Sequence, residues 1–378
     1  MAIGEDEMNP LDVIILRSQD IFSDSRVLRY EAWYKKNQIT YRIIGWDRQG
    51  KSLKRENTEY YDGIAGFQQG PKGILGRIKW NWFLLCYLFS HRHDYKIIHA
   101  CDFDTVMPSL FMKVFGKKVV FDIFDWFSDE VKTGKWYIDK PINFMEKLSV
   151  KLADLVIICE KGRLPQMEVI PDQYIIVPNI PEGIDDLAFP SESSSDYHDD
   201  DFSIAIAYVG GLVEHRGLKE LVTVVSRYPH IRLNIAGFGD DALVQYITRM
   251  SEKFTNIFYY GKIPYGEALS IMKQSDLLYA MYYKTNPNHL YAAPNKFYEA
   301  LALEKPIITT AGTLVGDKVK SIKSGYVINE GERAFEELLD KLINDGMHIK
   351  MDFAKAFQNE ISIKDGAVLK YKDFIFQR

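Results

Sequence analysis

The sequence predicts an α/β protein built from two doubly wound domains in tandem. Short runs rich in valine and isoleucine alternate with amphipathic stretches, a pattern typical of parallel sheets with crossover helices. The 378 residues also exceed the roughly 250–300 residues beyond which one hydrophobic core stops growing. A serine- and aspartate-rich stretch, residues 191–201, separates two series of such runs. We therefore expect two Rossmann-like domains that face a cleft, joined by an exposed linker.

The first series predicts six strands with helices between them. The helix expected at residues 25–36 places Val27 and Tyr34 on one face, and Asp24 or Ser25 can cap its start. The strands are expected at residues 11–17, 39–45, 96–100, 118–124, 154–159 and 174–178.

The second series repeats this order after the linker. Its strands are expected at residues 203–210, 231–237, 255–261, 276–281, 305–310 and 325–328. Near the C-terminus, Val368, Tyr371 and Phe374 share one side of a helix. The predicted organisation is a first domain at 1–190, a linker at 191–201, a second domain at 202–362, and a helix at 363–378 that docks on the first domain.

Composition excludes several classes of protein. The chain has 47 Lys and Arg against 52 Asp and Glu and is 47% hydrophobic, which is ordinary for a soluble globular protein. Cys86, Cys101 and Cys159 include no close pair, so they form neither a disulfide framework nor a CxxC metal site. This favours a reducing, cytoplasmic compartment. The longest apolar run, residues 82–89, is far shorter than the ~20 residues that span a membrane.

The first domain is basic and carries an aromatic helix. Residues 26–118 hold 17 basic and 8 acidic side chains, which suits an anionic partner. The helix expected at 74–89 crowds aromatic side chains beside basic ones, as at the surface of an anionic bilayer. A core helix of a large domain that uses aromatics as filling is the alternative interpretation, and nucleic acid is not expected because no binding motif accompanies the charge. The aromatic residues are Trp80, Trp82, Phe83, Tyr87 and Phe89.

The segment YVGGLVEHRGLKELV, residues 208–222, is the sharpest local motif. A strand ends in Gly210 and Gly211, and a helix is expected to open near Arg216. Glycines that allow close backbone approach, helix amides and a guanidinium together suit phosphate oxygens. A tight glycine turn with a surface arginine is the alternative interpretation.

Two further glycine turns follow strands at the same expected sheet edge. IRLNIAGFGDD contains Gly237 in a Gly-x-Gly turn, and NIFYYGKIP ends in Gly261, Lys262 and Ile263. Glycine is common wherever a strand gives way to a helix, so each turn alone is weak evidence.

A third segment, HLYAAPNKFYEALALEKPIITT at residues 289–310, predicts a helix that starts at a proline. Pro294 is followed by Asn295, Lys296 and, one turn later, Glu299. A carboxylate there can accept hydrogen bonds from two adjacent ribose hydroxyls, or it can simply interact favourably with the helix dipole.

In this order, G-x-L-x-x-x-R-G-L, I-A-G-x-G, x-x-G-x-I-P, P-N-K-F-Y-E-A-L-A and K-P-I-I-T resemble the donor half of family four of the glycosyltransferases, retaining enzymes with the GT-B fold. DSRVLRYEAWYKKN resembles that family's first helix, and residues 96–125 resemble its central pair of strands. The resemblance covers about residues 11–342.

The resemblance implies a donor nucleotide held by the second domain and an acceptor held by the first. It places Glu299 on the ribose hydroxyls, Arg216 on the diphosphate, residues 261–263 beside the nucleobase, and residues 294–296 near the diphosphate and sugar.

The chain departs from the family pattern at several positions. Tyr291 replaces a glutamate that normally helps to hold the donor sugar, and Gly211 replaces an arginine. Cys101 and Phe124 stand where the family often has histidines, which leaves Asp102 and Asp125 as candidates for orienting an acceptor hydroxyl, or as helix caps. The D-x-D spelled by Asp102 and Asp104 is interpreted as coincidence, and no metal or cofactor is expected.

The expected function is transfer of a sugar from a nucleotide sugar to a glycan or lipid-linked acceptor in polysaccharide or glycolipid assembly. The catalytic candidates are Asp102, Asp125 and Arg216. The expected location is the cytoplasm, peripheral at the inner face of the membrane. A non-catalytic partner subunit that binds nucleotide and a GT-B sugar epimerase are the alternatives.

Overall fold

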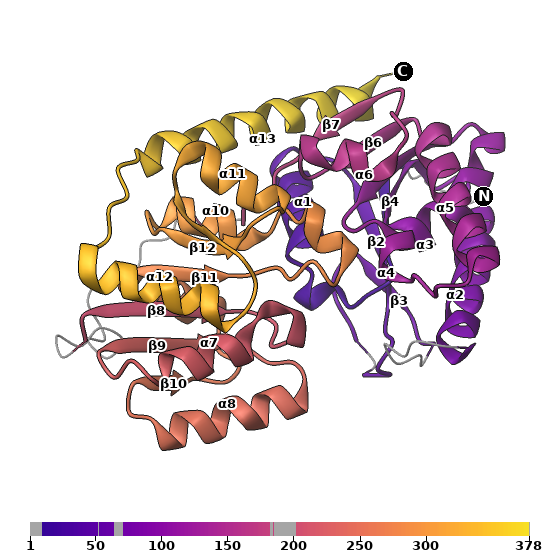
Figure 1. The fold of residues 1–378 in the computed structure, drawn as a ribbon. Helices are drawn as coiled ribbons and strands as arrows, with labels where there is room; N and C mark the ends of the chain where they lie inside the picture. The colour runs from indigo at the N-terminus through magenta and orange to yellow at the C-terminus, as the bar shows by residue number, and fades with distance from the viewer. Residues whose placement is uncertain (1–9, 52, 64–70, 182–183, 185–201, 378) are drawn as a thin grey trace, which may run out of the picture. The chain divides into compact units, whose positions relative to one another are not determined.

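The computed structural model describes residues 10–51, 53–63, 71–181, 184 and 202–377. The chain forms two compact units: Met1–Pro178 with Ile363–Arg378, and Asn179–Ser362 (Figure 1). The predicted linker, residues 191–201, lies outside the described residues. No described helix is both long enough and apolar enough to cross a membrane.

The first unit is built on a seven-stranded sheet whose neighbouring strands are parallel. The six predicted strands are present, because their apolar runs are buried on both faces of the sheet. The sequence did not predict the edge strand Thr58–Tyr61, whose pattern is mostly polar and whose residues are half-buried or exposed. In spatial order the strands are β3 (Thr58–Tyr61), β2 (Tyr41–Trp46), β1 (Leu11–Arg17), β4 (Tyr95–Cys101), β5 (Lys118–Ile123), β6 (Leu155–Ile158) and β7 (Tyr174–Ile176).

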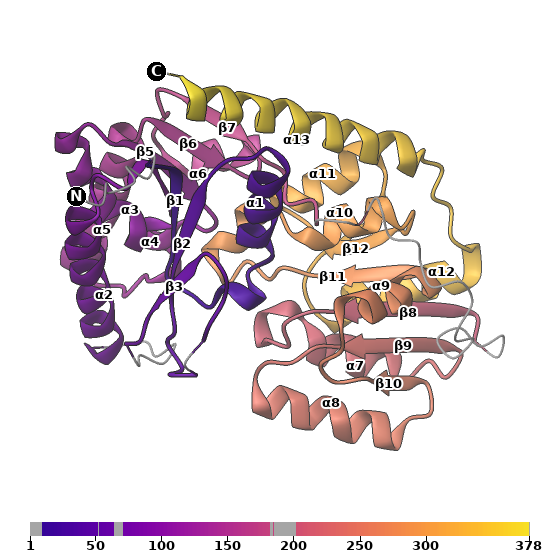
Figure 2. The same ribbon diagram turned by 180° about the vertical axis from the view of Figure 1, so that it is seen from behind.

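Helices cover both faces of this sheet (Figure 2). One face packs on α1 (Ser25–Lys36) and on the second half of α13 (Phe353–Phe376). Asp24 caps α1 by accepting the N–H groups of Arg26 and Val27. The other face packs on α2 (Pro71–Ser90), α3 (Phe103–Phe111) and α5 (Trp136–Leu152). Shorter helices in this unit are α4 (Phe127–Glu130) and α6 (Leu164–Met167).

The aromatic helix α2 only partly matches the membrane face predicted from the sequence. Trp80 is buried and stacks on Trp46 with ring centroids 5.4 Å apart, and Phe83 and Tyr87 pack on the same core cluster. These three side chains lie on the inner side of α2. Among the five predicted aromatics, Trp82 and Phe89 are the exposed ones.

The second unit is built on a six-stranded sheet, also with parallel neighbours. Its predicted strands are all present. In spatial order they are β10 (Ile257–Tyr259), β9 (Ile231–Ala236), β8 (Ile204–Val209), β11 (Leu277–Ala280), β12 (Ile307–Thr310) and β13 (Gly325–Ile328).

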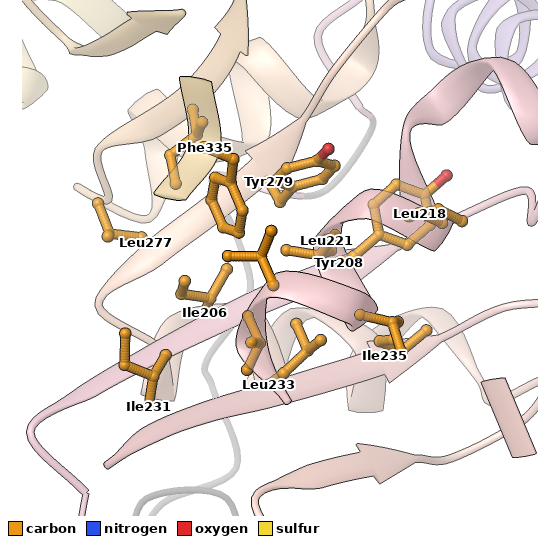
Figure 3. Packing of buried hydrophobic residues seen from close by; sticks show 14 of the residues in the cluster. Ile206, Tyr208, Leu218, Leu221, Ile231, Leu233, Ile235, Leu277, Tyr279 and Phe335 are labelled. Atoms are coloured by element: carbon orange, nitrogen blue, oxygen red, sulfur yellow. The ribbon is translucent and has the colours of Figure 1, made fainter. Parts of the chain in front are cut away.

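Two cores sandwich this second sheet. Figure 3 shows the first core, where Tyr279 of β11 meets Phe335 of α12 edge to face at 5.6 Å. Its helices are α7 (Leu218–Val225), α8 (Asp241–Lys253) and α12 (Glu332–Asp345). The opposite core holds α9 (Tyr265–Gln274), α10 (Asn295–Ala302), α11 (Leu314–Ile322) and the start of α13. Because the strands are parallel, the loops that follow them gather at one edge of the sheet.

Candidate functional site

The loop after β8 adopts a backbone that depends on glycine. Gly210 has φ 144°, which other residues rarely adopt, and its N–H donates to the Ala236 carbonyl at 2.9 Å. Arg216 then ends a short 3₁₀ turn, Glu214–Arg216, and Gly217 interrupts the helical path with φ 64°. A helix was predicted to begin near Arg216, and α7 begins two residues later, at Leu218.

The guanidinium of Arg216 lies over an aromatic ring, and one of its N–H donors has no hydrogen-bond partner among the described residues. Its Cζ lies 4.0 Å from the centroid of the Tyr282 ring. Its Nη1 is buried and has no hydrogen-bond partner among the described residues. A buried donor left without a partner costs about 1–3 kcal/mol, and a planar guanidinium matches phosphate oxygens. This atom is therefore a candidate anchor for an anion.

Lys296, in the first turn of α10, points at the Gly210 loop. A Cβ added to Gly210 would stand 2.5 Å from Lys296 Nζ, and Nζ also lies 5.1 Å from the Tyr208 ring centroid. Burial lowers the pKa of Lys296 to about 8; Glu299 opposes this shift and Arg216 adds to it. Two cations and a glycine backbone thus share one small region.

Glu299 lies one turn further along α10 and is buried. Tyr265, at the start of α9, donates a hydrogen bond to its Oε1 at 3.0 Å. Burial raises the pKa of Glu299, while Lys296 and this hydrogen bond act in the opposite direction. The Glu299 carboxylate is therefore held in place by this hydrogen bond. Sequence reasoning missed Tyr265, which lies 34 residues away along the chain.

Three post-strand turns are joined through their backbones. The N–H of Gly237, at φ 148°, donates to the Gly261 carbonyl at 2.8 Å. A Cβ on Gly237 would overlap the Gly210 carbonyl oxygen, so only glycine fits there. The predicted glycines 210, 237 and 261 therefore lie at neighbouring turns, whereas Gly211 is exposed with open space around it.

The other predicted donor residues lie around these turns. Lys262 is exposed, with Nζ 4.8 Å from the ring centroid of the exposed Phe238, and Ile263 packs on the core beneath. Pro294 occupies the N-cap position of α10, and Asn295 opens that helix. Tyr291 ends the 3₁₀ turn Pro287–Tyr291 and is half-buried.

A pair of histidines near Arg216 was not predicted. His289 and His215 have ring centroids 4.8 Å apart, and His289 Nδ1 lies 2.8 Å from the Tyr283 carbonyl oxygen. Burial lowers the pKa of His289 to about 4, and the charge of Arg216 adds to the shift. His289 is therefore neutral near pH 7 and donates through Nδ1 to that carbonyl. Both histidines lie in segments singled out from the sequence, 208–222 and 289–310, but no spacing in those segments marks them as a pair.

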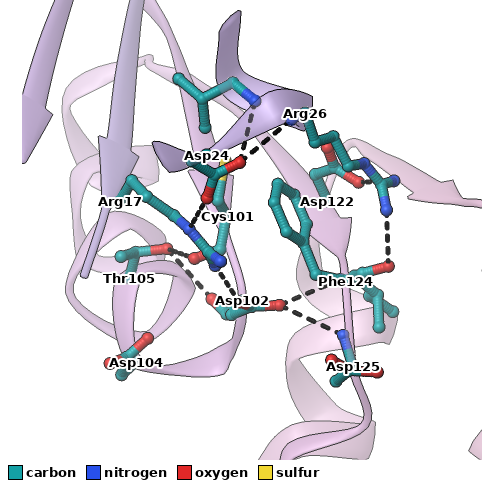
Figure 4. A network of polar contacts seen from close by, with 12 residues as sticks. Arg17, Asp24, Arg26, Cys101, Asp102, Asp104, Thr105, Asp122, Phe124 and Asp125 are labelled. Atoms are coloured by element: carbon teal, nitrogen blue, oxygen red, sulfur yellow. Dashed lines mark hydrogen bonds and ion pairs between the residues drawn. The ribbon is translucent and has the colours of Figure 1, made fainter. Parts of the chain in front are cut away.

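In the first unit, Asp102 braces the ends of neighbouring strands (Figure 4). One of its oxygens pairs with Arg17 at the end of β1. The other accepts the N–H of Phe124, after β5, at 3.0 Å. Asp102 occupies the N-cap position of α3 with φ 70°, but its carboxylate makes no cap hydrogen bond, so its side chain does not cap the helix.

Asp102 lies in a group of opposed charges at this edge of the first sheet. Burial raises its pKa to about 7, with Asp104 and Asp125 adding to the shift and Arg17 opposing it. Asp125 is more accessible: its side chain is 59% exposed, and Arg163 donates to it at 3.2 Å. The structure therefore brings both predicted aspartates to one edge, but only Asp125 offers a largely exposed carboxylate.

One buried group of metal-ligating type lies in the described part of the first unit. His99, Cys101 and Asp122 place one candidate ligand atom each within 4.8 Å of one another. Two of these groups already have partners, since His99 Nδ1 lies 2.7 Å from Tyr371 Oη and Asp122 forms an ion pair with Arg26. We interpret them as a buried polar network that fixes α1 and α13 on the sheet.

Comparison with known protein families finds a match in the second unit. Residues 195–360 match the model of the family described as glycosyl transferases group 1. A capsular polysaccharide biosynthesis glycosyltransferase, CapM of Staphylococcus aureus, is 29% identical over 152 residues, covering 38% of this chain. The matched stretch spans 37% of CapM's own length. The resemblance recognised from the motifs is thereby confirmed.

Solved structures match over almost the whole chain. HepE of Anabaena in complex with UDP aligns with a TM-score of 0.68 at 13% identity, covering 96% of this chain and 99% of that one. Sucrose-phosphate synthase of Thermosynechococcus elongatus aligns with a TM-score of 0.66 at 14% identity, covering 96% and 98%. Identities this low show the fold alone. The predicted GT-B fold is confirmed.

Proposed function

We propose that this chain is a retaining, metal-independent glycosyltransferase that moves a sugar from a nucleoside diphosphate sugar to a glycan or lipid-linked acceptor. One observation carries the proposal: a buried guanidinium donor without a partner, the Lys296 ammonium and the Gly210 backbone converge beside the carboxylate of Glu299. The family match to residues 195–360 and the UDP complex of HepE support the choice of donor.

The two cations carry the proposed chemistry. As the bond to the sugar breaks, negative charge develops on the leaving diphosphate, and Arg216 and Lys296 stabilise it. Glu299 fixes the nucleotide by accepting the ribose hydroxyls. In the proposal these cations do the work that a metal does elsewhere, and the acceptor attacks the same face of the anomeric carbon that the diphosphate leaves.

The acceptor chemistry is assigned to the first unit. Asp125 is the candidate that contacts an acceptor hydroxyl, since its carboxylate is mostly exposed. Asp102 is a positioning residue, because both of its oxygens are already engaged. The setting we propose is polysaccharide or glycolipid assembly in the cytoplasm, with the chain peripheral to the membrane where the acceptor is lipid-linked.

Nucleotide release from a panel of nucleotide sugars tests this proposal. We expect Glu299→Ala to weaken binding of every donor, and Arg216→Ala to lower turnover by about 10² to 10³, as loss of an oxyanion-type donor does. Glu330→Ala is the matched control, because it removes a half-buried carboxylate of the same unit that accepts the Lys284 N–H. Unchanged release in both test variants would place the donor elsewhere.

A nucleotide-binding partner subunit remains the second candidate function. It is favoured by the engaged oxygens of Asp102 and by Tyr291 at the position of a donor-sugar carboxylate. Donor binding without release, across all donors and acceptors supplied, supports this candidate against the first.

A further inference from the structure

The outer side of the helix layer α2, α3 and α5 exposes large apolar side chains. These helices lie side by side over one face of the first unit's sheet (Figures 1 and 2). On α2, Ile78, Trp82 and Phe89 are exposed at helical spacing, with Trp82 68% exposed. The buried Trp80, Leu84 and Leu88 follow the opposite side of the same helix.

The apolar side chains continue onto the neighbouring elements. After α3, the turn Met112–Phe115 exposes Val114 and Phe115, and Phe115 meets Phe89 of α2 edge to face at 5.4 Å. On α5, Trp136 and Phe144 are 70% and 65% exposed. We call this surface, from Ile78, Trp82 and Phe89 through Val114 and Phe115 to Trp136 and Phe144, the apolar outer face.

Basic side chains are interleaved with these apolar ones. Lys140 of α5 lies one turn from both Trp136 and Phe144, and its Nζ is 5.7 Å from the Trp136 ring centroid. Lys79, Lys132 and Lys135 are exposed on or between the same helices. Arg92, just after α2, lies 4.7 Å from the Phe89 ring centroid.

Acidic side chains are fewer around this face, although Asp94 and Glu130 are exposed beside Arg92 and Lys132. Asp139 accepts the N–H groups of Thr133 and Gly134, and Asp154 pairs with Lys113. Glu146 is buried and accepts the N–H groups of Phe127 and Ser128. The exposed Lys79, Lys132, Lys135 and Lys140 outnumber Asp94 and Glu130, so the accessible charge of the apolar outer face is mainly positive.

We propose that the apolar outer face docks on an anionic phospholipid surface. Trp, Phe and Ile beside Lys and Arg are the composition of helices that lie in a bilayer interface. A protein partner is disfavoured, because lysine is depleted at the centres of protein interfaces. The inference rests on the proposed function, since a lipid-linked acceptor gives a transferase reason to bind a bilayer, but the face itself is independent of the donor site.

A native cysteine allows a direct test. Cys86 is exposed on α2, between Trp82 and Phe89, whereas Cys101 and Cys159 are buried. We expect an environment-sensitive fluorophore on Cys86 to shift to shorter wavelength with phosphatidylglycerol-containing vesicles at low salt. Phosphatidylcholine vesicles are expected to give little shift, and high salt to reverse it. No shift with anionic vesicles overturns the proposal.

Co-sedimentation of the unlabelled chain separates the contributions. Trp82→Ser and Phe144→Ser are each expected to lower vesicle partitioning about tenfold, ~1.4 kcal/mol. Lys140→Glu is expected to lower it about fivefold or more, because each basic group near an anionic surface contributes about that factor. Leu369→Ser and Lys370→Glu are the matched controls, since both residues are exposed on α13, which packs on the other face of the sheet.

Other outcomes would overturn the proposal that the apolar outer face docks on phospholipid. If Trp82→Ser and Phe144→Ser leave vesicle binding unchanged, the proposal is wrong. If these variants instead abolish self-association of a chain that ignores vesicles, the face binds a second copy and the proposal is overturned. Nucleotide binding is measured in parallel on every variant. If the parent chain binds nucleotide but does not bind anionic vesicles, this inference alone is rejected. If it binds anionic vesicles but no nucleotide, the proposed function alone is rejected.

Discussion

The side chain of Lys296 occupies the space that a Cβ on Gly210 would need, with Nζ 2.5 Å from that position. Gly210 lies in the loop after β8, and Lys296 lies in the first turn of α10, which follows β11. They meet because both strands end at the same edge of the sheet. A backbone turn without a side chain and a partly desolvated ammonium are thereby combined in one region. This combination suits the oxygens of a diphosphate.

Gly210→Ala is therefore expected to weaken nucleoside diphosphate binding by at least about tenfold. The methyl group displaces Nζ, and the φ of 144° is strained for alanine at a cost of about 1–3 kcal/mol. Titration calorimetry with UDP, GDP and ADP measures the effect. Gly211→Ala is the control, because its Cβ meets nothing within 4 Å, and we expect its affinity to match that of the parent chain. Equal losses in both variants would contradict the account.

Diphosphate binding is expected to take up protons near pH 8. The pKa of Lys296 in the empty site is lowered to about 8, so part of the population is uncharged there. A bound diphosphate favours the ammonium and raises its pKa, so binding draws a proton from the buffer. The binding enthalpy should therefore depend on the ionisation enthalpy of the buffer at pH 8, and affinity should fall as pH rises above 8.

Two lysine variants identify the group that takes up this proton. Lys296→Met should abolish the buffer dependence, whereas Lys262→Met, which removes an exposed lysine from a neighbouring turn, should keep it. Buffer-independent enthalpies in the parent chain at pH 8 are incompatible with a lysine of lowered pKa in the site.

Tyr265→Phe is expected to weaken nucleotide binding several-fold, and more at pH 6 than at pH 8. The Tyr265 hydroxyl donates to Glu299 and lowers its pKa, whereas burial raises it. Without this hydrogen bond the pKa of Glu299 rises further, so less of the carboxylate is ionised at pH 6. Tyr246→Phe, which removes a hydroxyl 2.8 Å from Thr223 in the same unit, serves as the control. A pH-independent loss argues against this role.

Asp102 is expected to make stability fall with rising pH. Its pKa is raised from 3.8 to about 7 in the folded chain, so between these values the native state binds its proton more tightly than the unfolded state does. The contribution of this group is present below pH 4 and is lost as pH rises through 7. In urea unfolding, Asp102→Asn should therefore lose less stability relative to the parent at pH 8 than at pH 5. A constant difference across that range contradicts the raised pKa.

Local patterns were enough to predict much of the fold. β1 and α1 have the predicted bounds, Leu11–Arg17 and residues 25–36, because a buried parallel strand and an Asp-capped amphipathic helix are marked by nearby residues. Two features depend on tertiary packing and could not be predicted from local sequence patterns. Trp80 is buried against Trp46, and the edge strand β3 lacks an apolar pattern.

The residues of the candidate site were also predictable only where they belong to local motifs. Gly210, Arg216, Lys296 and Glu299 belong to contiguous motifs, and the structure brings them to one edge of the second sheet. The group that holds Glu299 comes from elsewhere in the chain, since Tyr265 lies 34 residues away. The same is true in the first unit, where Arg17 lies 85 residues from the Asp102 that it pairs with. Such pairs become neighbours only through the order of strands in the sheet. A single sequence carries no local signal for them.

The central claim is sugar transfer from a nucleotide donor with retention of configuration. It is tested most directly by proton NMR of the chain with an α-linked nucleotide sugar, which follows nucleoside diphosphate release and the first-formed anomer of the product. The account predicts nucleoside diphosphate and the α-anomer first, with both signals lost in Arg216→Ala. Binding without release of nucleotide for every donor, or a β-anomer formed first, would contradict it.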